Sequence, residues 1–253
     1  MTSGDICNGD IRIGDVQADA TDAEATETAA AAIEPRDAAS LIILDQTPKG
    51  IYMLMGKRHE GHVFMPGAYV FPGGRVEACD SEMVVAGMLH PAAEHKLMQH
   101  VADPSPFGAR ALALAAIRET FEETGHLVGS TDYGAPEETP PGWEAFAEHG
   151  VFPELDMLHF IARAITPPHY PRRFDARFFV VDASAIVHTV PGAVERDGEL
   201  VELAWVAVDK AADINTPLIT RIVAAELSAR LAAGFIQEAP VPFYHGDKVA
   251  GTL

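Results

Sequence analysis

The feature that most constrains this chain is an acidic string, Arg118-Glu119-Thr120-Phe121-Glu122-Glu123-Thr124-Gly125, which follows a run rich in alanine and leucine. The run favours a helix, and a glycine such as Gly125 is typical of the position that ends one. On that helix Glu119, Glu122 and Glu123 stand at i, i+3 and i+4, so they share one face with Cβ atoms about 5–6 Å apart. Three like charges repel, so a partly buried face of this kind needs a compensating positive charge.

The three glutamates predict a site for a hard divalent cation. Mg²⁺ and Mn²⁺ prefer oxygen ligands and keep several waters for contact with phosphate groups. Arg118 can reach Glu122 at i+4, or a carboxylate from a segment upstream, and so orient the ligands. The same string also fits an ordinary solvated acidic face.

A second segment, Phe71-Pro72-Gly73-Gly74-Arg75-Val76-Glu77, bears on the choice between these interpretations. Gly73 and Gly74 let the backbone approach a phosphate or a metal with no Cβ in the way, and a carbonyl there can serve as a ligand. Two glycines alone usually mark only a turn. Together with the glutamates downstream, they favour the cation site.

The two segments resemble the signature of the Nudix hydrolases. That signature reads G, five residues, E, seven residues, R-E-U-x-E-E-x-G-U, where U is a bulky apolar residue. Gly74 matches the first glycine, and Asp80 takes the place of the first glutamate. The chain then departs from the pattern, because Arg118 lies 38 residues after Asp80 instead of eight. Thr120 and His126 also stand where the pattern has apolar residues.

This split signature resembles one branch of the family, the Nudix 19-type coenzyme A diphosphatases. The stretch from Ile165 to Phe179, with Thr166-Pro167-Pro168 and Arg172-Arg173-Phe174-Asp175-Ala176-Arg177, is similar to a further motif of that branch. The resemblance covers roughly residues 37 to 210. It implies an α/β fold, an α/β/α sandwich around a mixed sheet, with residues 37–253 as one Nudix domain and 81–108 as a helical insertion.

Hydrophobic patterning predicts the elements that carry these motifs. Apolar runs predict strands at 38–45, 51–57, 158–164, 176–181 and 200–208, and helical periodicity predicts helices at 109–124 and 219–236. The periodicity from Met83 to Met98 predicts one or two helices that cap the substrate cleft. Residues 1–36, rich in Ala, Asp, Thr and Glu, are expected to form a disordered or loosely helical tail.

The resemblance implies a metal-dependent hydrolase of a nucleoside diphosphate linked to another group, such as coenzyme A or an acyl-coenzyme A. Water attacks one phosphorus while Mg²⁺ or Mn²⁺ neutralises the phosphate oxygens. The resemblance assigns Glu119, Glu122 and Glu123 as the metal ligands, joined by the Gly73 carbonyl, with Arg118 orienting them.

The general base that positions the water has two candidates. In the family it is either a glutamate of the signature, which Glu119 fits, or a residue in a later loop, which Glu199 fits. Glu202 fits a solvent-exposed strand end better, and Glu195 is a further rival. Glu199 also fits an ordinary loop carboxylate.

The charge of the chain limits its partners. The net charge is −19 with only 18 Lys and Arg residues, which argues against a general nucleic-acid surface. A phosphorylated small molecule can still bind through metal ions and a few arginines. The candidates are Arg58, Arg172, Arg173 and Arg177, beside the backbone of Gly73 and Gly74. Each arginine taken singly also fits a surface ion pair.

The small number of cysteines indicates a reducing compartment, and the hydropathy of the chain bears on its targeting. Cys7 and Cys79 do not make a disulfide framework. No secretory signal and no apolar stretch of 18 residues is found, so we expect a cytoplasmic protein without a membrane span. His90, His95 and His100 recur at steps of five residues, which do not share a helix face, so we expect no zinc site.

Two other functions fit the same residues. One is a Nudix-fold module that senses a nucleotide conjugate without cleaving it, and the other is a hydrolase of ADP-ribose or NADH. The intact set of Arg118 and three glutamates favours catalysis over sensing, because a sensor has little use for the repulsion. The sequence does not give the oligomeric state, and the apolar C-terminal helix is a candidate surface for a homodimer.

Overall fold

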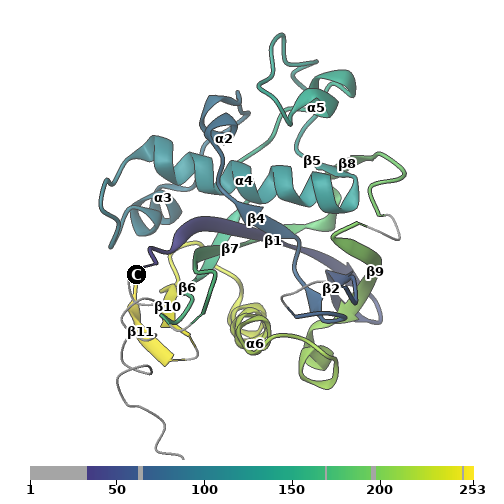
Figure 1. The fold of residues 1–253 in the computed structure, drawn as a ribbon. Coiled ribbons are helices and arrows are strands. Elements are labelled where there is room, and N and C mark those ends of the chain that lie inside the picture. The colour runs from purple at the N-terminus through teal and green to yellow at the C-terminus, as the bar shows by residue number, and fades with distance from the viewer. Residues whose placement is uncertain (1–32, 62–64, 169, 195–197, 247) are drawn as a thin grey trace, which may run out of the picture.

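A mixed sheet of nine strands forms the centre of the fold (Figure 1). The computed structural model describes residues 33–61, 65–168, 170–194, 198–246 and 248–253, so the predicted tail up to residue 32 and Glu195 lie outside it. The main path of the sheet runs β11-β10-β6-β7-β1-β2-β3, while β4 pairs with β1 and β9 with β2. The strands are β1 (Arg36–Thr47), β2 (Gly50–Arg58), β3 (Tyr69–Val70), β4 (Gly73–Arg75), β6 (His159–Ile165), β7 (Phe174–Asp182), β9 (Leu200–Ala207), β10 (Pro242–His245) and β11 (Lys248–Thr252).

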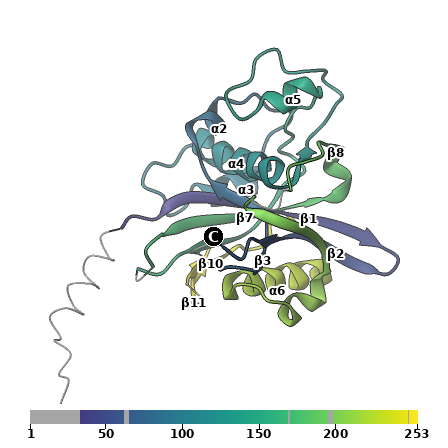
Figure 2. The same ribbon diagram turned by 45° about the vertical axis from the view of Figure 1, so that its right-hand side comes forward.

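Helices cover both faces of this sheet (Figure 2). They are α2 (Ala78–Glu82), α3 (Pro91–Leu97), α4 (Pro106–Thr124), α5 (Glu144–Glu148) and α6 (Leu218–Ala233), with 3₁₀ turns η1 (Ala183–Ala185) and η2 (Val208–Asp213). A second, two-stranded sheet joins β5 (His126–Val128) to β8 (Ile186–Thr189) beside the end of α4. Within the described ranges, no helix has both the length and the apolar character needed to cross a membrane.

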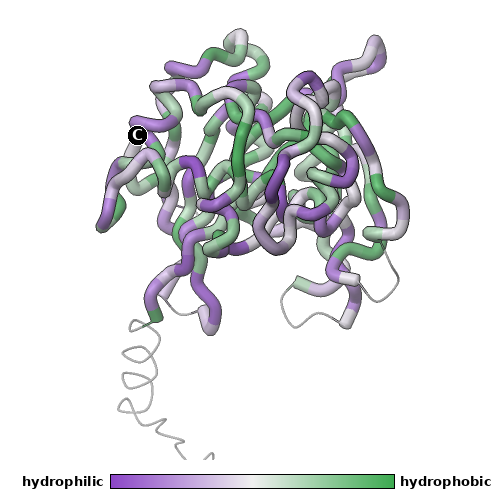
Figure 3. The backbone as a smooth tube through the Cα atoms, turned by 90° about the horizontal axis from the view of Figure 1, so that it is seen from above, coloured by the Kyte–Doolittle hydropathy of each residue, from purple (hydrophilic) through white to green (hydrophobic). Residues whose placement is uncertain are grey.

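The centre of the sheet is buried on both sides. β1 pairs in parallel with β7, and its residues Leu41 to Leu44 form a continuous apolar run, as expected for a strand covered on two faces. Leu41 and Ile43 pack in the cluster that contains α4, whereas Ile42 and Leu44 pack in the cluster that contains α6. Apolar segments accordingly run through the interior in Figure 3. The predicted α/β/α sandwich around a mixed sheet is confirmed.

The predicted helix of the signature is present as α4. Ser105 caps its start by accepting a hydrogen bond from the Gly108 amide (3.1 Å), and Pro106 occupies the first turn. Gly125 ends it in the left-handed conformation, with φ of 76°. The helix therefore begins three residues before the predicted start and ends where predicted.

Of the one or two helices predicted from Met83 to Met98, the structure has one, α3, in the second half of the stretch. Only α3 is helical, because Pro91 starts it and His90 caps it. Before that point the Arg110 guanidinium binds the carbonyls of Ser81 (2.8 Å) and Met83 (3.1 Å), which a continuing helix would have used. The apolar side chains of this stretch still enter the core, which accounts for the periodic pattern.

Two further expectations change. β1 begins at Arg36, whose amide donates to the Arg173 carbonyl (3.0 Å), so the sheet starts one residue inside the predicted tail. The apolar side of α6 packs on the sheet through Val223, Ala224 and Leu227. That side is therefore not the dimer surface that the sequence indicated.

Candidate functional site

The glycine segment lies between β1 and α4. The backbone groups of successive residues in this segment bind alternately to β1 and to side chains of α4. On the side of β1, the Pro72 carbonyl accepts from the Leu41 amide (3.0 Å), and the Val76 amide donates to the Asp37 carbonyl (3.0 Å). In an antiparallel ladder the intervening residues direct their backbone groups the other way. The backbone of Gly73 and Arg75 is therefore available to α4.

Those groups bind two residues of the signature helix. The Gly73 amide donates to the Glu123 carboxylate (3.0 Å), and the Arg75 carbonyl accepts from the Arg118 guanidinium (2.9 Å). The glycine segment and the acidic helix are thus connected directly, as the sequence predicted.

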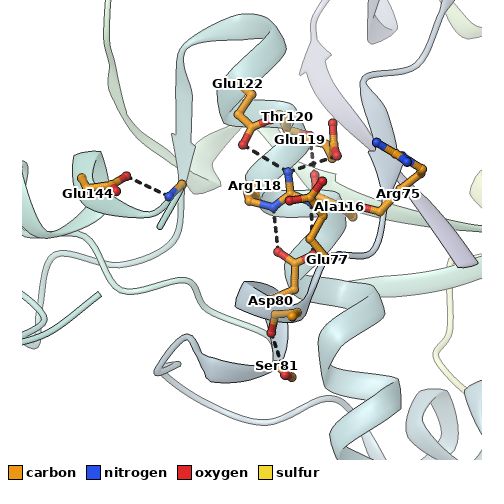
Figure 4. A network of polar contacts seen from close by, with 12 residues as sticks. Arg75, Glu77, Asp80, Ser81, Ala116, Arg118, Glu119, Thr120, Glu122 and Glu144 are labelled. Atoms are coloured by element: carbon orange, nitrogen blue, oxygen red, sulfur yellow. Dashed lines mark hydrogen bonds and ion pairs between the residues drawn. The ribbon is translucent and has the colours of Figure 1, made fainter. Parts of the chain in front are cut away.

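Arg118 is the centre of the polar network (Figure 4). It is almost fully buried, and it binds both oxygens of Asp80 at 2.7 and 3.1 Å, a bidentate pair. Its Nη1 also donates to Glu119 (3.0 Å) and Glu122 (3.1 Å). Arg118 therefore reaches both of its predicted partners, the glutamate one turn on and a carboxylate from the segment upstream.

Asp80 is held in place by its own helix. It lies in α2 with no exposed surface, and its second oxygen accepts from the Glu77 amide (2.8 Å). It is the aspartate that replaces the signature glutamate. Its shorter side chain still reaches Arg118 although 38 residues separate them in the sequence.

The three glutamates differ in burial. Glu123 is buried, Glu119 is largely buried, and Glu122 has a side chain that is 45% exposed. Burial raises the pKa of Glu119 to about 7; the neighbouring Arg118 opposes this rise, while the charges of Glu122 and Glu199 add to it. The site thus holds carboxylates whose charge the protein compensates only in part.

Glu123 is still more perturbed. Burial raises its pKa well above the ordinary value, and the charges of Glu199 and Glu119 add to the effect. The Gly73 amide and Arg58 oppose it. The deprotonated form therefore needs a further positive charge close by.

Both glycines of the segment are required by close packing. A Cβ on Gly73 would overlap the backbone of Ala39 and Ser40, and a Cβ on Gly74 would overlap the carboxyl group of Glu119. The second overlap is with the end of a flexible side chain. A substitution there would move the carboxylate rather than break the sheet.

Arg58 and Glu199 form an ion pair of 2.6 Å at the edge of the same site. Glu199 acts on the pKa of both Glu119 and Glu123, so its charge is close to theirs. It is half exposed, which leaves it accessible to water. Glu202 instead accepts from the hydroxyl of Tyr69 (3.1 Å), which lies in β3 on the other side of β2.

The other predicted arginines have different roles. The Arg173 guanidinium donates to the carbonyls of Thr166 (3.1 Å) and Ile33 (2.6 Å). Arg177 is buried and pairs with Asp37 (2.6 Å) and Asp175. Arg172 is exposed. Within the described part of the chain, none of these three side chains forms a hydrogen bond or an ion pair with the glutamates. The sequence prediction failed here because a sequence pattern does not distinguish a phosphate contact from an internal ion pair.

One wall of the site was missed by sequence reasoning. Gly142 has φ of 89°, and a Cβ on it would lie 3.4 Å from Arg118 and 3.6 Å from Glu122. Its amide donates to Glu144 (2.9 Å; Figure 4). The fully buried Trp143 fixes this turn in the core against Phe146, with ring centroids 4.8 Å apart. The Pro-Pro-Gly string at 140–142 was the available signal.

The fit of a divalent cation rests on the chemistry of the donors. Among the described residues, no three His, Cys, Asp or Glu side chains converge as a preformed cation site. Glu119 and Glu122 point to Arg118, and Glu123 points to the Gly73 amide. The donors are nevertheless hard oxygens, and the pKa values of two of these carboxyl groups, Glu119 and Glu123, are raised, chiefly by burial.

Comparison with known proteins agrees with this fold. No family model matches the chain. A curated relative, nudix hydrolase 7 of Caenorhabditis elegans, is 27% identical over 188 residues, or 70% of this chain and 53% of the relative. The acyl-coenzyme A diphosphatase NUDT19 of Gallus gallus is 37% identical over 95 residues, or 30% of this chain and 25% of the relative. The chain thus spans about half and about a quarter of the length of these relatives.

A solved structure extends the likeness over most of the chain. The crystal structure of a NUDIX hydrolase from Alicyclobacillus acidocaldarius superposes with a TM-score of 0.60 at 25% identity, covering 83% of this chain and 100% of that one. The fold agrees with this match. The chain is similar to Nudix hydrolases in sequence and in fold.

We expect Gly74→Ala to lower the activity of the site with little effect on the stability of the fold. The new Cβ displaces the Glu119 carboxylate, so hydrolytic activity should fall at least tenfold while the free energy of unfolding changes by less than about 1 kcal/mol. Activity assays and urea denaturation would measure the two effects. Gly251→Ala, where a Cβ meets no atom, is the matched control. Undiminished activity in Gly74→Ala would contradict the geometry.

The raised pKa values predict a pH-dependent stability without added cations. Between about 4.5 and 7, the folded state holds protons on Glu119 and Glu123 that the unfolded chain has lost, so the free energy of unfolding falls as pH rises. Glu123→Gln removes one buried charge and should stabilise the protein at pH 8 by about 1–3 kcal/mol, with little effect at pH 5. Urea denaturation in EDTA tests this, with exposed Glu138→Gln as control. Destabilisation at pH 8 would refute it.

Proposed function

We propose that the protein is a divalent-metal-dependent hydrolase that cleaves the diphosphate of a nucleoside diphosphate conjugate, with coenzyme A or an acyl-coenzyme A as substrate. The observation that carries the proposal is the buried Arg118, which holds Asp80, Glu119 and Glu122 beside the glycine segment. The similarity to Nudix hydrolases supports the reaction. The name of the Gallus gallus relative supports the substrate class.

The chain supplies the ligands for Mg²⁺ or Mn²⁺ from two elements. Glu119, Glu122 and Glu123 of α4 would hold the cation together with the Gly73 carbonyl, which the strand alternation directs toward α4. When bound, such a cation neutralises phosphate oxygens and makes a bound water more acidic. The loss of repulsion between the glutamates contributes to its binding.

Arg118 acts on the ligands and not on the substrate. Its guanidinium is occupied by Asp80, the Arg75 carbonyl and two glutamates, so it has little capacity left for a phosphate. Its hydrogen bonds fix the side-chain conformations of Glu119 and Glu122. We therefore assign it a positioning role.

The proton of the attacking water has two possible acceptors. Glu119 has a pKa near 7, which suits a base at neutral pH, but it is also a metal ligand. Glu199 is half exposed, lies beside the same carboxylates and is held by Arg58. We favour Glu199, because a ligand carboxylate has its lone pairs engaged by the cation.

The reaction and its substrate are tested with a panel of coenzyme A, acetyl-coenzyme A, ADP-ribose, NADH and diadenosine polyphosphates in Mg²⁺ or Mn²⁺. We expect turnover of the coenzyme A compounds, and a loss of at least 100-fold in kcat for Glu122→Gln because a ligand is removed. Glu138→Gln is the control. Turnover of ADP-ribose or NADH alone would replace the substrate class, and tight binding without turnover would indicate a sensor.

The identity of the base is tested by comparing two variants. Glu199→Gln should lower kcat about 100-fold or more and abolish the fall in rate on the acidic side of the pH profile, with the affinity for Mn²⁺ unchanged. Glu119→Gln should weaken Mn²⁺ binding, as measured by titration calorimetry. An unchanged kcat in Glu199→Gln would return the role to Glu119.

A further inference from the structure

The strand β9 forms an open edge of the central sheet (Figure 1). It pairs with β2 on one side. Within the described ranges its other side pairs with no strand, and no loop backbone is hydrogen-bonded to it. Proteins usually protect such an edge with lysine, proline or a short strand, because unpaired backbone groups bind a further strand. β9 has eight residues without lysine or proline, and its pairing is irregular only near its start.

Trp205 is an exposed aromatic residue on this strand. Its side chain is 42% exposed, although Leu54, the β2 residue paired with it, is buried. Leu203 is two residues earlier and so on the same face, where it packs against the cluster that contains α4. Tryptophan is enriched in contacts between proteins, because it buries a large area at a small cost in conformational entropy. The edge therefore presents unpaired backbone and a large apolar side chain together.

The charges along the edge do not oppose a second copy of the chain. Glu202 is the only charged side chain of β9, and it accepts from the Tyr69 hydroxyl (3.1 Å). Before the strand, Glu199 is paired with Arg58 (2.6 Å), and after it Asp209 belongs to the turn η2. A partner strand therefore meets a single carboxylate, although the whole chain has a net charge of −19.

A second copy fits this edge in only a few registers. Two antiparallel copies of β9 are related by a two-fold axis, and residues directly opposite each other lie on the same face of the joined sheet. One residue at the axis therefore faces its own copy. An axis at Glu202 would bring two carboxylates together, which is unfavourable. An axis at Ala204 instead places Glu202 opposite Val206 of the partner subunit.

We propose that β9 is the contact surface of a homodimer, in which two copies join their sheets through antiparallel β9 strands centred on Ala204. In this arrangement Leu203 of the partner subunit covers each Trp205. The nine-stranded sheet then continues across the two-fold axis. The dimer does not depend on the reaction proposed above, and its tests measure association alone.

Sedimentation equilibrium of the full chain tests the association. A paired edge of this length is a small interface, so we expect a dissociation constant on the order of 1–100 μM. Because both copies are acidic, raising NaCl from about 50 to about 500 mM should tighten the dimer several-fold by screening their repulsion. A monomer at all concentrations up to about 500 μM, at both salt concentrations, would overturn the proposal.

Two variants of Trp205 locate the interface. Trp205→Lys should weaken the dimer at least tenfold, because it places a charge opposite Leu203 of the partner subunit, whereas Trp205→Phe should change it less than about threefold. Met88→Lys makes the same change of charge at an apolar side chain that is 79% exposed in the insertion, and it should leave the dimer intact. Circular dichroism checks that each variant is folded. An unchanged dimer in Trp205→Lys would contradict the surface.

A cysteine at the two-fold axis tests the register without weakening the contact. Residues directly opposite in an antiparallel pair have Cα atoms about 4.5–5.5 Å apart, which suits a disulfide. In a background with Cys7→Ser and Cys79→Ser, Ala204→Cys should therefore form a covalent dimer under mild oxidation. Val206→Cys should not, because its own copy lies about 13 Å away along the strands. Equal cross-linking of the two variants, or none in Ala204→Cys, would refute the register and with it the proposed dimer.

Discussion

The bidentate pair between Arg118 and Asp80 is the interaction on which the rest of the site depends. It joins α4 to α2, and through the Arg75 carbonyl it also joins α4 to β4. Because both side chains are buried, removal of one partner would leave an uncompensated charge and would cost about 3–5 kcal/mol. The pair therefore fixes three elements at once, and the positions of Glu119 and Glu122 follow from it.

The same region shows why a stable fold can hold an unfavourable charge distribution. Glu119, Glu122, Glu123 and Glu199 share only two arginines, Arg58 and Arg118, and the Gly73 amide. Burial and the mutual repulsion raise the pKa values of Glu119 and Glu123. Burial in the cluster around Leu41, Ile43 and α4 offsets that cost. The electrostatic repulsion is concentrated where a bound cation would relieve it. Perturbed pKa values of this kind cluster at functional sites.

Local spacing allowed the sequence to predict the helix, its glutamates, the glycine segment and the strands β1 and β2, which pair where Thr47 meets Gly50. These features depend on neighbours in the chain. The failures depend on distant contacts. The Arg110 side chain binds the carbonyls of Ser81 and Met83, so the helix α2 does not continue into the insertion. The strand β10 forms because Phe243 to His245 pair with Arg163 to Ile165 of β6.

Side-chain roles were the hardest part to predict for the same reason. Arg173 and Arg177 carry the motif that suggested phosphate contacts, yet their hydrogen bonds are made within the fold. Arg36 belongs to no motif, and only the packing of β1, β4 and α2 places it at the same cavity as Arg75 of the glycine segment. Which arginine is free depends on where its nearest carboxylate lies, and sequence spacing does not contain that information.

The pairing of Asp80 with Arg118 also closes the insertion at its base. The insertion begins after α2, contains α3 and ends in α4. The bond between Asp80 and Arg118 therefore holds the two ends of the insertion next to each other. The entropic cost of such a closed loop grows only slowly with its length, by about 0.6 kcal/mol for each doubling. The number of residues between the two halves can therefore drift while the site stays intact. What defines this signature is a contact between two side chains, and a search by fixed spacing would pass over it.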